Sequence, residues 1–262
     1  MAKRKHWAAI LLVAAMACGG RPADAAVVLL TATRTLSVSS SEQPAVAPVQ
    51  FDGSGLFWDS RSVGAPMAPG QAGTEALAEQ TLSTVTNNNG VLQVFTQSAR
   101  ATSRANGGTA EAPFDVRAAT DLRLTFSVTD TPAPVTLSAS LIGAISGNGP
   151  TNLIDFAYFL RLSSITTGLD VLNVQGDPAT ARPQDSVLNF TGTLPVGTYA
   201  FDVGASTRAQ SFGLNPTARP GTSALFNNLL LSVVPEPAAA GLLTLAVPLL
   251  RRGRRAERAP AA

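Results

Sequence analysis

Residues 121–129 read DLRLTFSVT, a stretch in which apolar and polar side chains alternate without a break. Its apolar members are Leu122, Leu124, Phe126 and Val128. A period of two is typical of a β-strand with one face in a core and the other in water, whereas an α-helix repeats about every 3.6 residues. This stretch therefore predicts a sheet protein whose strands are buried on one side.

The same alternation resumes after a Pro-rich turn at 130–134, where residues 135–141 place apolar side chains between Thr and Ser. Two such runs joined by a short turn are expected to be neighbouring antiparallel strands. Similar patterns extend in both directions along the chain. Further strands are expected at 29–39, 49–58, 91–101, 156–163, 169–174, 199–206 and 225–234.

The segments between these strands carry turn signals. Residues 64–73 form a Pro/Gly-rich loop and 87–90 a turn, while 74–84 fits a helix or a strand equally well. We expect roughly nine to eleven strands and no interior helix. The fold class expected for residues 26–234 is all-β, a jelly-roll-like antiparallel β-sandwich in one domain.

The first 25 residues have the organisation of a secretion signal peptide. A positive cluster at residues 3–6 precedes an uncharged apolar run, and Ala23 and Ala25 flank Asp24 in the small-residue pattern that signal peptidase cleaves. We therefore expect a signal helix that is removed, so that the mature chain begins at Ala26. A second interpretation, in which Cys18 is the lipidated residue of a lipoprotein, stays open.

The C-terminal residues 235–262 combine three features in order. These are Pro235-Glu236-Pro237, an uncharged apolar stretch at 238–250, and an arginine cluster. The cluster consists of Arg251, Arg252, Arg254 and Arg255. Apolar residues partition into a bilayer and arginines hold their end on the cytoplasmic side, so we expect a hydrophobic helix that retains the exported chain at the membrane for a time. The alternative is a buried core helix with a basic tip.

This tail resembles the PEP-CTERM sorting segment of exported bacterial proteins, which an exosortase, a membrane-embedded enzyme, recognises. The resemblance covers only about the last thirty residues, and the family also requires the N-terminal signal peptide. It implies a protein of the cell envelope or the extracellular space that is transiently anchored through its tail. The partners implied are the exosortase, signal peptidase and the membrane.

Composition excludes several classes of chemistry for the mature chain. Residues 26–234 contain ten arginines and fourteen acids, a net charge of 10 − 14 = −4, which gives no support for nucleic-acid binding. The single His, the single Cys and both Lys residues all lie in the signal peptide. Histidine-based hydrolase triads, Cys/His zinc sites, disulfides and lysine Schiff bases are thereby excluded. We expect no enzyme activity, no cofactor and no metal site.

Trp58 is the one residue that the sequence offers as a ligand contact. It lies in an aromatic, acidic and Gly-rich segment at 51–59, which favours a core position for the indole but could also form a sugar-stacking surface. Two functions follow from these alternatives. The first is a structural or adhesive β-sandwich, and the second is an extracellular carbohydrate-binding module or a weak carbohydrate-active enzyme. The partner of the second would be an extracellular polysaccharide.

Overall fold

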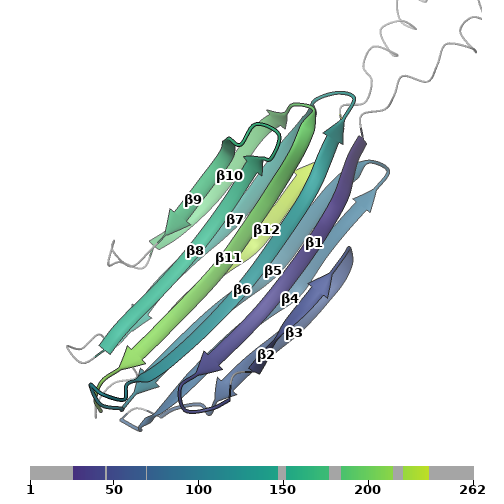
Figure 1. The fold of residues 1–262 in the computed structure, drawn as a ribbon. Coiled ribbons are helices and arrows are strands. Elements are labelled where there is room, and N and C mark those ends of the chain that lie inside the picture. The colour runs from purple at the N-terminus through teal and green to yellow at the C-terminus, as the bar shows by residue number, and fades with distance from the viewer. Residues whose placement is uncertain are drawn as a thin grey trace, which may run out of the picture.

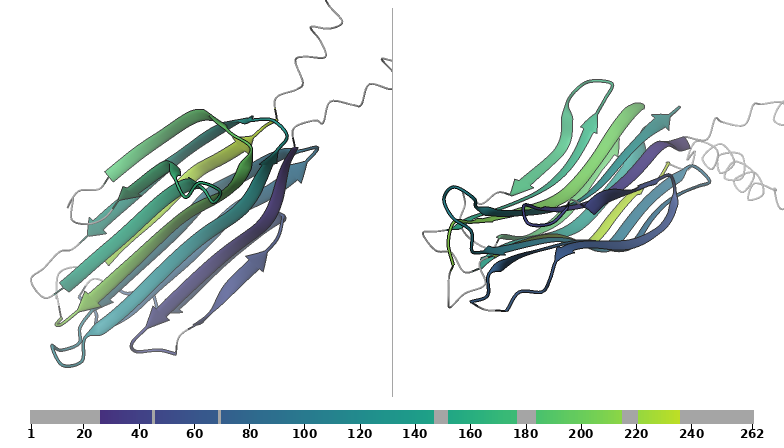
Figure 2. Two further views of the ribbon diagram at one scale, coloured as in Figure 1. Left: turned by 45° about the horizontal axis from the view of Figure 1, so that its top comes forward. Right: turned by 60° about the horizontal axis from the view of Figure 1, so that its bottom comes forward.

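The computed structural model describes residues 26–44, 46–68, 70–146, 152–176, 184–214 and 221–235. These residues form twelve strands in two six-stranded antiparallel sheets that pack face to face (Figure 1). Two further views show the sheets as separate, twisted layers (Figure 2). The prediction of an antiparallel β-sandwich is confirmed, with slightly more strands than expected.

Each sheet combines strands from distant parts of the chain. The first sheet, sheet A, has the order β2 (Val46–Asp52), β1 (Ala26–Ser40), β6 (Phe114–Thr129), β11 (Gly197–Ser211), β8 (Asn152–Ser164) and β9 (Asp170–Gly176). The second sheet, sheet B, has the order β10 (Gln184–Leu194), β7 (Ala133–Ser146), β12 (Gly221–Val233), β5 (Val91–Asn106), β4 (Gly73–Asn88) and β3 (Gly55–Gly64).

The alternation in the sequence determines which face of each strand is buried. Leu122, Leu124, Phe126 and Val128 of β6 are all at most 1% exposed, and the polar residues between them point away from the core. The inward faces of β8, β11 and β12 behave in the same way. One continuous core therefore lies between the sheets.

The prediction that the runs at 121–129 and 135–141 pair with each other is wrong. β6 pairs with β1 and β11 in sheet A, whereas β7 pairs with β10 and β12 in sheet B. Between them the chain crosses from one sheet to the other, and Asp130 at this corner has a φ of 64°. Because β6 and β7 lie in opposite sheets, their apolar faces point toward each other and are buried in the same core.

Two further expectations need correction, and one open alternative is resolved. The run at 49–58 is not one strand, because β2 ends at Asp52 in sheet A and β3 begins at Gly55 in sheet B. Residues 74–84 belong to the long strand β4. β10 was not expected as a strand, since the segment 184–194 has few apolar residues. The signal helix and the C-terminal helix lie outside the described residues.

Both ends of the sandwich domain lie at the same end of the molecule. Ala26 at the start of β1 pairs with Thr129, and Val234 after β12 donates a backbone hydrogen bond to the carbonyl of Pro134, only a few residues away in the chain. Figure 1 shows the chain entering and leaving the sandwich there. We call this the tail end, and the opposite end, with the loop 107–113, the far end.

The core changes character between the two ends. Leu and Phe side chains fill it toward the tail end, whereas Ala, Ser and Thr dominate toward the far end. There Ser103 of β5 forms a 2.8 Å hydrogen bond with the hydroxyl of Thr207 of β11, directly from sheet to sheet. Small side chains thus allow the sheets to approach closely, and hydrogen bonds replace part of the apolar contact.

Candidate functional site

Trp58 is a surface residue, so the expectation that its indole lies in the core is wrong. Its side chain is 75% exposed on the outward face of β3, while the preceding Phe57 faces the core. A β-bulge at this position interrupts the pairing with β4 between Phe57 and Asp59. Phe57 and Trp58 are neighbours in the sequence, so a period of two places one of them inward and the other outward, and the segment alone does not say which.

Trp58 borders an open depression of about 440 Å³ on sheet B. The depression is completed by Thr81 and Leu82 of β4 and by Gln97 and Ser98 of β5. It offers one large ring, one apolar side chain, hydroxyls and an amide, but no carboxylate. This set of groups can stack against and hydrogen-bond to a ligand, and it lacks the pair of acids that glycoside hydrolysis requires.

The backbone beneath the depression is irregular. Leu82 and Asn228 both have positive φ, 45° and 50°, and each lies beside Gln97, one on β4 and the other on β12. Leucine rarely adopts this conformation, since its Cβ clashes with the following carbonyl at a cost of roughly 1–2 kcal/mol. The regular backbone geometry of sheet B is therefore interrupted on two strands between Trp58 and Asn228.

Large apolar side chains surround Trp58 on the same outward face. Their exposed fractions range from 39% to 60%, and they are Leu56, Leu82, Phe95 and Leu230. Leu56, Thr84, Phe95 and Leu230 follow one another in register across β3, β4, β5 and β12. The residues therefore form one continuous patch rather than scattered exposed positions, and such patches on soluble domains mark interaction surfaces.

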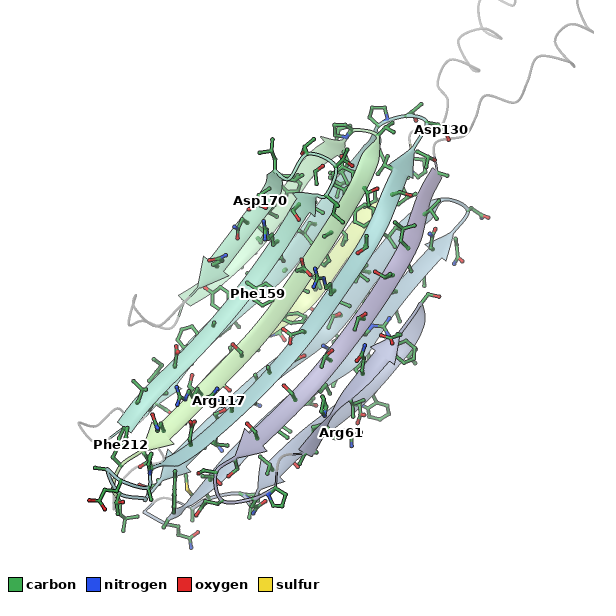
Figure 3. All side chains as sticks on the ribbon, viewed as in Figure 1. Arg61, Arg117, Asp130, Phe159, Asp170 and Phe212 are labelled. Carbon is green, nitrogen blue, oxygen red and sulfur yellow. The ribbon has the colours of Figure 1, made fainter. Side chains whose placement is uncertain are left out.

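The outer face of sheet A is chemically different, because it carries many charges. Asp115 accepts two hydrogen bonds from Arg208, at 3.0 and 2.7 Å, and Arg161 pairs with Asp170 at 2.7 Å. Arg117 of β6 and Asp170 of β9 are labelled in Figure 3. Burial by itself raises the pKa of Asp115, but the hydrogen bonds from Arg208 and Arg117 outweigh it and lower the pKa overall. Exposed ion pairs of this kind contribute little to stability.

Sheet A also has a groove of about 500 Å³ across its outer face toward the far end. Its floor consists of small side chains in register, Ser37, Ala119, Ser206 and Ala157. Beside it, the carboxylate of Asp121 and the ring of Phe159 both reach over Gly204. Burial, and secondarily the nearby charge of Asp202, raises the pKa of Asp121 to about 6.

A buried cation that the sequence did not reveal lies near the crossing from β2 to β3. Arg34 of β1 is fully buried, and its guanidinium lies 4.7 Å from the ring centre of Phe51 and 5.6 Å from that of Phe57. Its Nη2 donates to the carbonyl of Gly55 at 3.1 Å. Burial lowers the pKa of Arg34 to about 10. Aromatic rings here take the place of a carboxylate partner.

Most residues of the expected sorting machinery lie outside the described part of the chain. Pro235 is the last described residue and is separated from β12 only by Val234. Glu236, Pro237, the four arginines of the cluster, Ala23 and Ala25 are not described. Within the residues that are described, no group of three or more His, Cys, Asp or Glu side chains could hold a metal ion. Nor do these residues include a helix long and apolar enough to cross a membrane.

Comparisons with known proteins give only distant similarity. No protein-family model matches the sequence, and no curated protein matches it. A solved structure described as a carbohydrate-binding module of the β-sandwich superfamily aligns with 9% identity and a TM-score of 0.21, covering 80% of this chain and 98% of that one. The Gt strain structure of infectious bursal disease virus aligns with 11% identity and a TM-score of 0.17, covering 82% and 68%. Likeness at this level carries no argument about function.

Proposed function

We propose that this chain is an exported cell-envelope protein whose β-sandwich has a non-catalytic structural or adhesive role. Signal peptidase removes residues 1–25, and the PEP-CTERM-like tail at 235–262 is recognised by an exosortase and holds the chain transiently at the membrane. The observation that carries the proposal is the position of the chain ends. Ala26 and Val234 leave the sandwich at one end, so a membrane-bound tail would present the rest of the domain outward.

The winding of the chain supports a sandwich of the jelly-roll type within this proposal. From β5 to β8, and again from β9 to β12, each successive strand lies in the opposite sheet. Such alternation between two sheets is a feature of Greek-key and jelly-roll folds. Extracellular modules commonly use this architecture because both faces remain free to carry binding surfaces.

A second candidate function is carbohydrate binding through Trp58. The exposure of its indole, next to the hydroxyl of Thr81 and the amide of Gln97, favours it. Aromatic rings provide a flat apolar surface, and amides and hydroxyls can complete the hydrogen bonds of sugar hydroxyls. The two functions are compatible, since a carbohydrate could be the ligand to which an adhesive envelope protein binds.

The sorting proposal is tested by replacing Arg251, Arg252, Arg254 and Arg255 together with Gln. We expect the neutral variant to be released or mislocalised, because the positive charges no longer fix the cytoplasmic side of the tail. Cell fractionation with immunoblotting measures this. The matched control replaces the same four arginines with Lys, which keeps the charge and should keep the protein in the membrane fraction. Equal membrane retention of the Gln variant and the native chain would contradict the proposal.

A further inference from the structure

Half of the outer face of sheet B carries no charged side chain among the described residues. The nearest charged side chains described on this face are Glu79 and Arg100, which are register partners on β4 and β5. Asp59, next to Trp58, lies on the opposite side of β3 and pairs with Arg61. From Trp58 to the tail end, the outward positions hold the apolar patch and, beside it, a set of uncharged polar side chains. This polar set includes Thr84, Gln97, Asn228, Ser138 and Asn189. We call this region the uncharged half-face.

We propose that the uncharged half-face binds an uncharged polysaccharide that lies across the strands, with one sugar ring stacked on Trp58. The proposal rests on the proposed function, in which the sandwich is exported and so meets extracellular glycans. It adds the location of the binding surface, the direction of the bound chain and the class of glycan. None of these follows from the exposure of Trp58 alone.

The proposed direction of the bound polysaccharide follows from two rows of residues that run across the strands. Trp58, Leu82, Gln97 and Asn228 succeed one another over β3, β4, β5 and β12, and Leu56, Thr84, Phe95 and Leu230 form a parallel row. Neighbouring strands are about 4.8 Å apart, so four strands span roughly 14 Å. Both rows contain apolar and polar side chains, which suits a ligand that offers both C–H faces and hydroxyls along its length.

The chemistry of the half-face favours an uncharged ligand. Amides and hydroxyls donate and accept hydrogen bonds without preference for either sign of charge. An anionic polymer would gain no ion pair from the half-face, because no arginine among the described residues lies on it. A purely apolar partner would leave the amides of Gln97 and Asn228 without hydrogen bonds once water was displaced, which is unfavourable.

The backbone gives an independent indication that this surface is under functional constraint. Leu82 keeps a left-handed conformation at an exposed position, where a more tolerant residue such as Asn would fit the fold better. Strained backbone of this kind concentrates at binding sites. The conformation turns the Leu82 side chain into the depression beside Trp58.

The test uses the full-length chain in a detergent without sugar head groups, in a Trp7→Phe background that leaves Trp58 as the sole tryptophan. Hydroxyethylcellulose and dextran serve as uncharged probes and alginate as the anionic one. We expect the uncharged probes to shift the emission of Trp58 and alginate to leave it unchanged. Calorimetry should show a dissociation constant raised at least about tenfold by Trp58→Ala and about threefold or more by Gln97→Ala.

The matched control is Phe212→Ala, which removes another exposed aromatic ring at the far end and should leave the affinity unchanged. The proposal is overturned if neither uncharged probe binds, if alginate binds as tightly, or if Trp58→Ala binds as well as the native residue. It is also overturned if the emission of Trp58 shifts with protein concentration or lipid vesicles alone, which would indicate a second copy or a membrane as the occupant. None of these results would alter the fractionation experiment, so the two proposals fail separately.

Discussion

At the scale of single residues, Asp121 shows how register can perturb a carboxyl group. It lies opposite Gly204 on β11, and the ring of Phe159 reaches over the same glycine from β8. Glycine leaves room for both side chains, but the ring removes water from the carboxylate. The negative charge of Asp202, two residues before Gly204 on β11, further disfavours the ionised form, and the pKa of Asp121 rises to about 6.

The raised pKa predicts the pH dependence of stability. A carboxyl group whose folded pKa of about 6 exceeds its unfolded value of 3.8 favours folding most when protonated, so stability falls as the pH rises from about 4 to above 6. The shift corresponds to about 3 kcal/mol. We expect Asp121→Asn to raise the free energy of unfolding by up to that amount at pH 8 and to change little near pH 4. Thermal unfolding at both pH values measures this.

Asp115 provides the control of opposite sign. Its pKa is lowered in the folded protein, because the hydrogen bonds from Arg208 and Arg117 outweigh burial, so its contribution is present at neutral pH and lost as the pH falls below its unfolded value of 3.8. Asp115→Asn should therefore destabilise the protein at pH 8, where Asp121→Asn stabilises it. Equal effects of the two variants at pH 8 would contradict the assigned environments.

Single residues also mark the limit of prediction from sequence. The alternation in β1 places Arg34 on the inward face with Ala32 and Leu36, but composition gives no reason to expect a buried cation there. Its partners, Phe51 and Phe57, come from two other strands in different sheets. The face of Trp58 was not predictable for a related reason, since which of the neighbours Phe57 and Trp58 faces the core depends on how β3 packs on the rest of the sandwich and not on its own sequence.

At the scale of elements, a period of two indicates the buried face of a strand but not its neighbour. The strands at 121–129, 135–141 and 199–206 were predicted with their inward residues, and the structure confirms those faces. The pairing of the first two was wrong because the turn at Asp130 crosses between sheets. The turn into Tyr199 makes the same kind of crossing, and there the Tyr199 hydroxyl donates to the carbonyl of Pro195 at 2.8 Å.

Leu82 and Asn228, the two residues with positive φ beside Gln97, allow a prediction with two opposite substitutions. Asn tolerates positive φ better than Leu, since its short polar side chain can hydrogen-bond locally. Leu82→Asn should therefore raise the free energy of unfolding by about 1 kcal/mol, and Asn228→Leu should lower it by a similar amount. Leu230→Asn is the matched control, because Leu230 is similarly exposed but has ordinary backbone geometry and should gain nothing. Chemical denaturation of the three variants provides the measurement.

At the scale of the whole molecule, the sandwich has two unlike outer faces and two unlike ends. Ion pairs cover sheet A, and the uncharged half-face covers sheet B next to the tail end. Neither property is visible in the sequence, because each face assembles from alternate residues of six strands whose order differs from the chain order. Composition gave only the net charge, which averages over both faces.

The arrangement of the ends predicts how the domain stands on a membrane. Glu111 lies in the exposed far-end loop, whereas Val196 lies between β10 and β11 at the tail end. In a Cys18→Ser background the chain has no cysteine, so Glu111→Cys and Val196→Cys each introduce one labelling site. In cells whose envelope admits a bulky maleimide, we expect the far-end cysteine to react faster, because the membrane shields the tail end. After detergent solubilisation both should react alike, since both positions are exposed. Faster labelling of Val196→Cys in cells would mean that the tail does not hold the sandwich by this end.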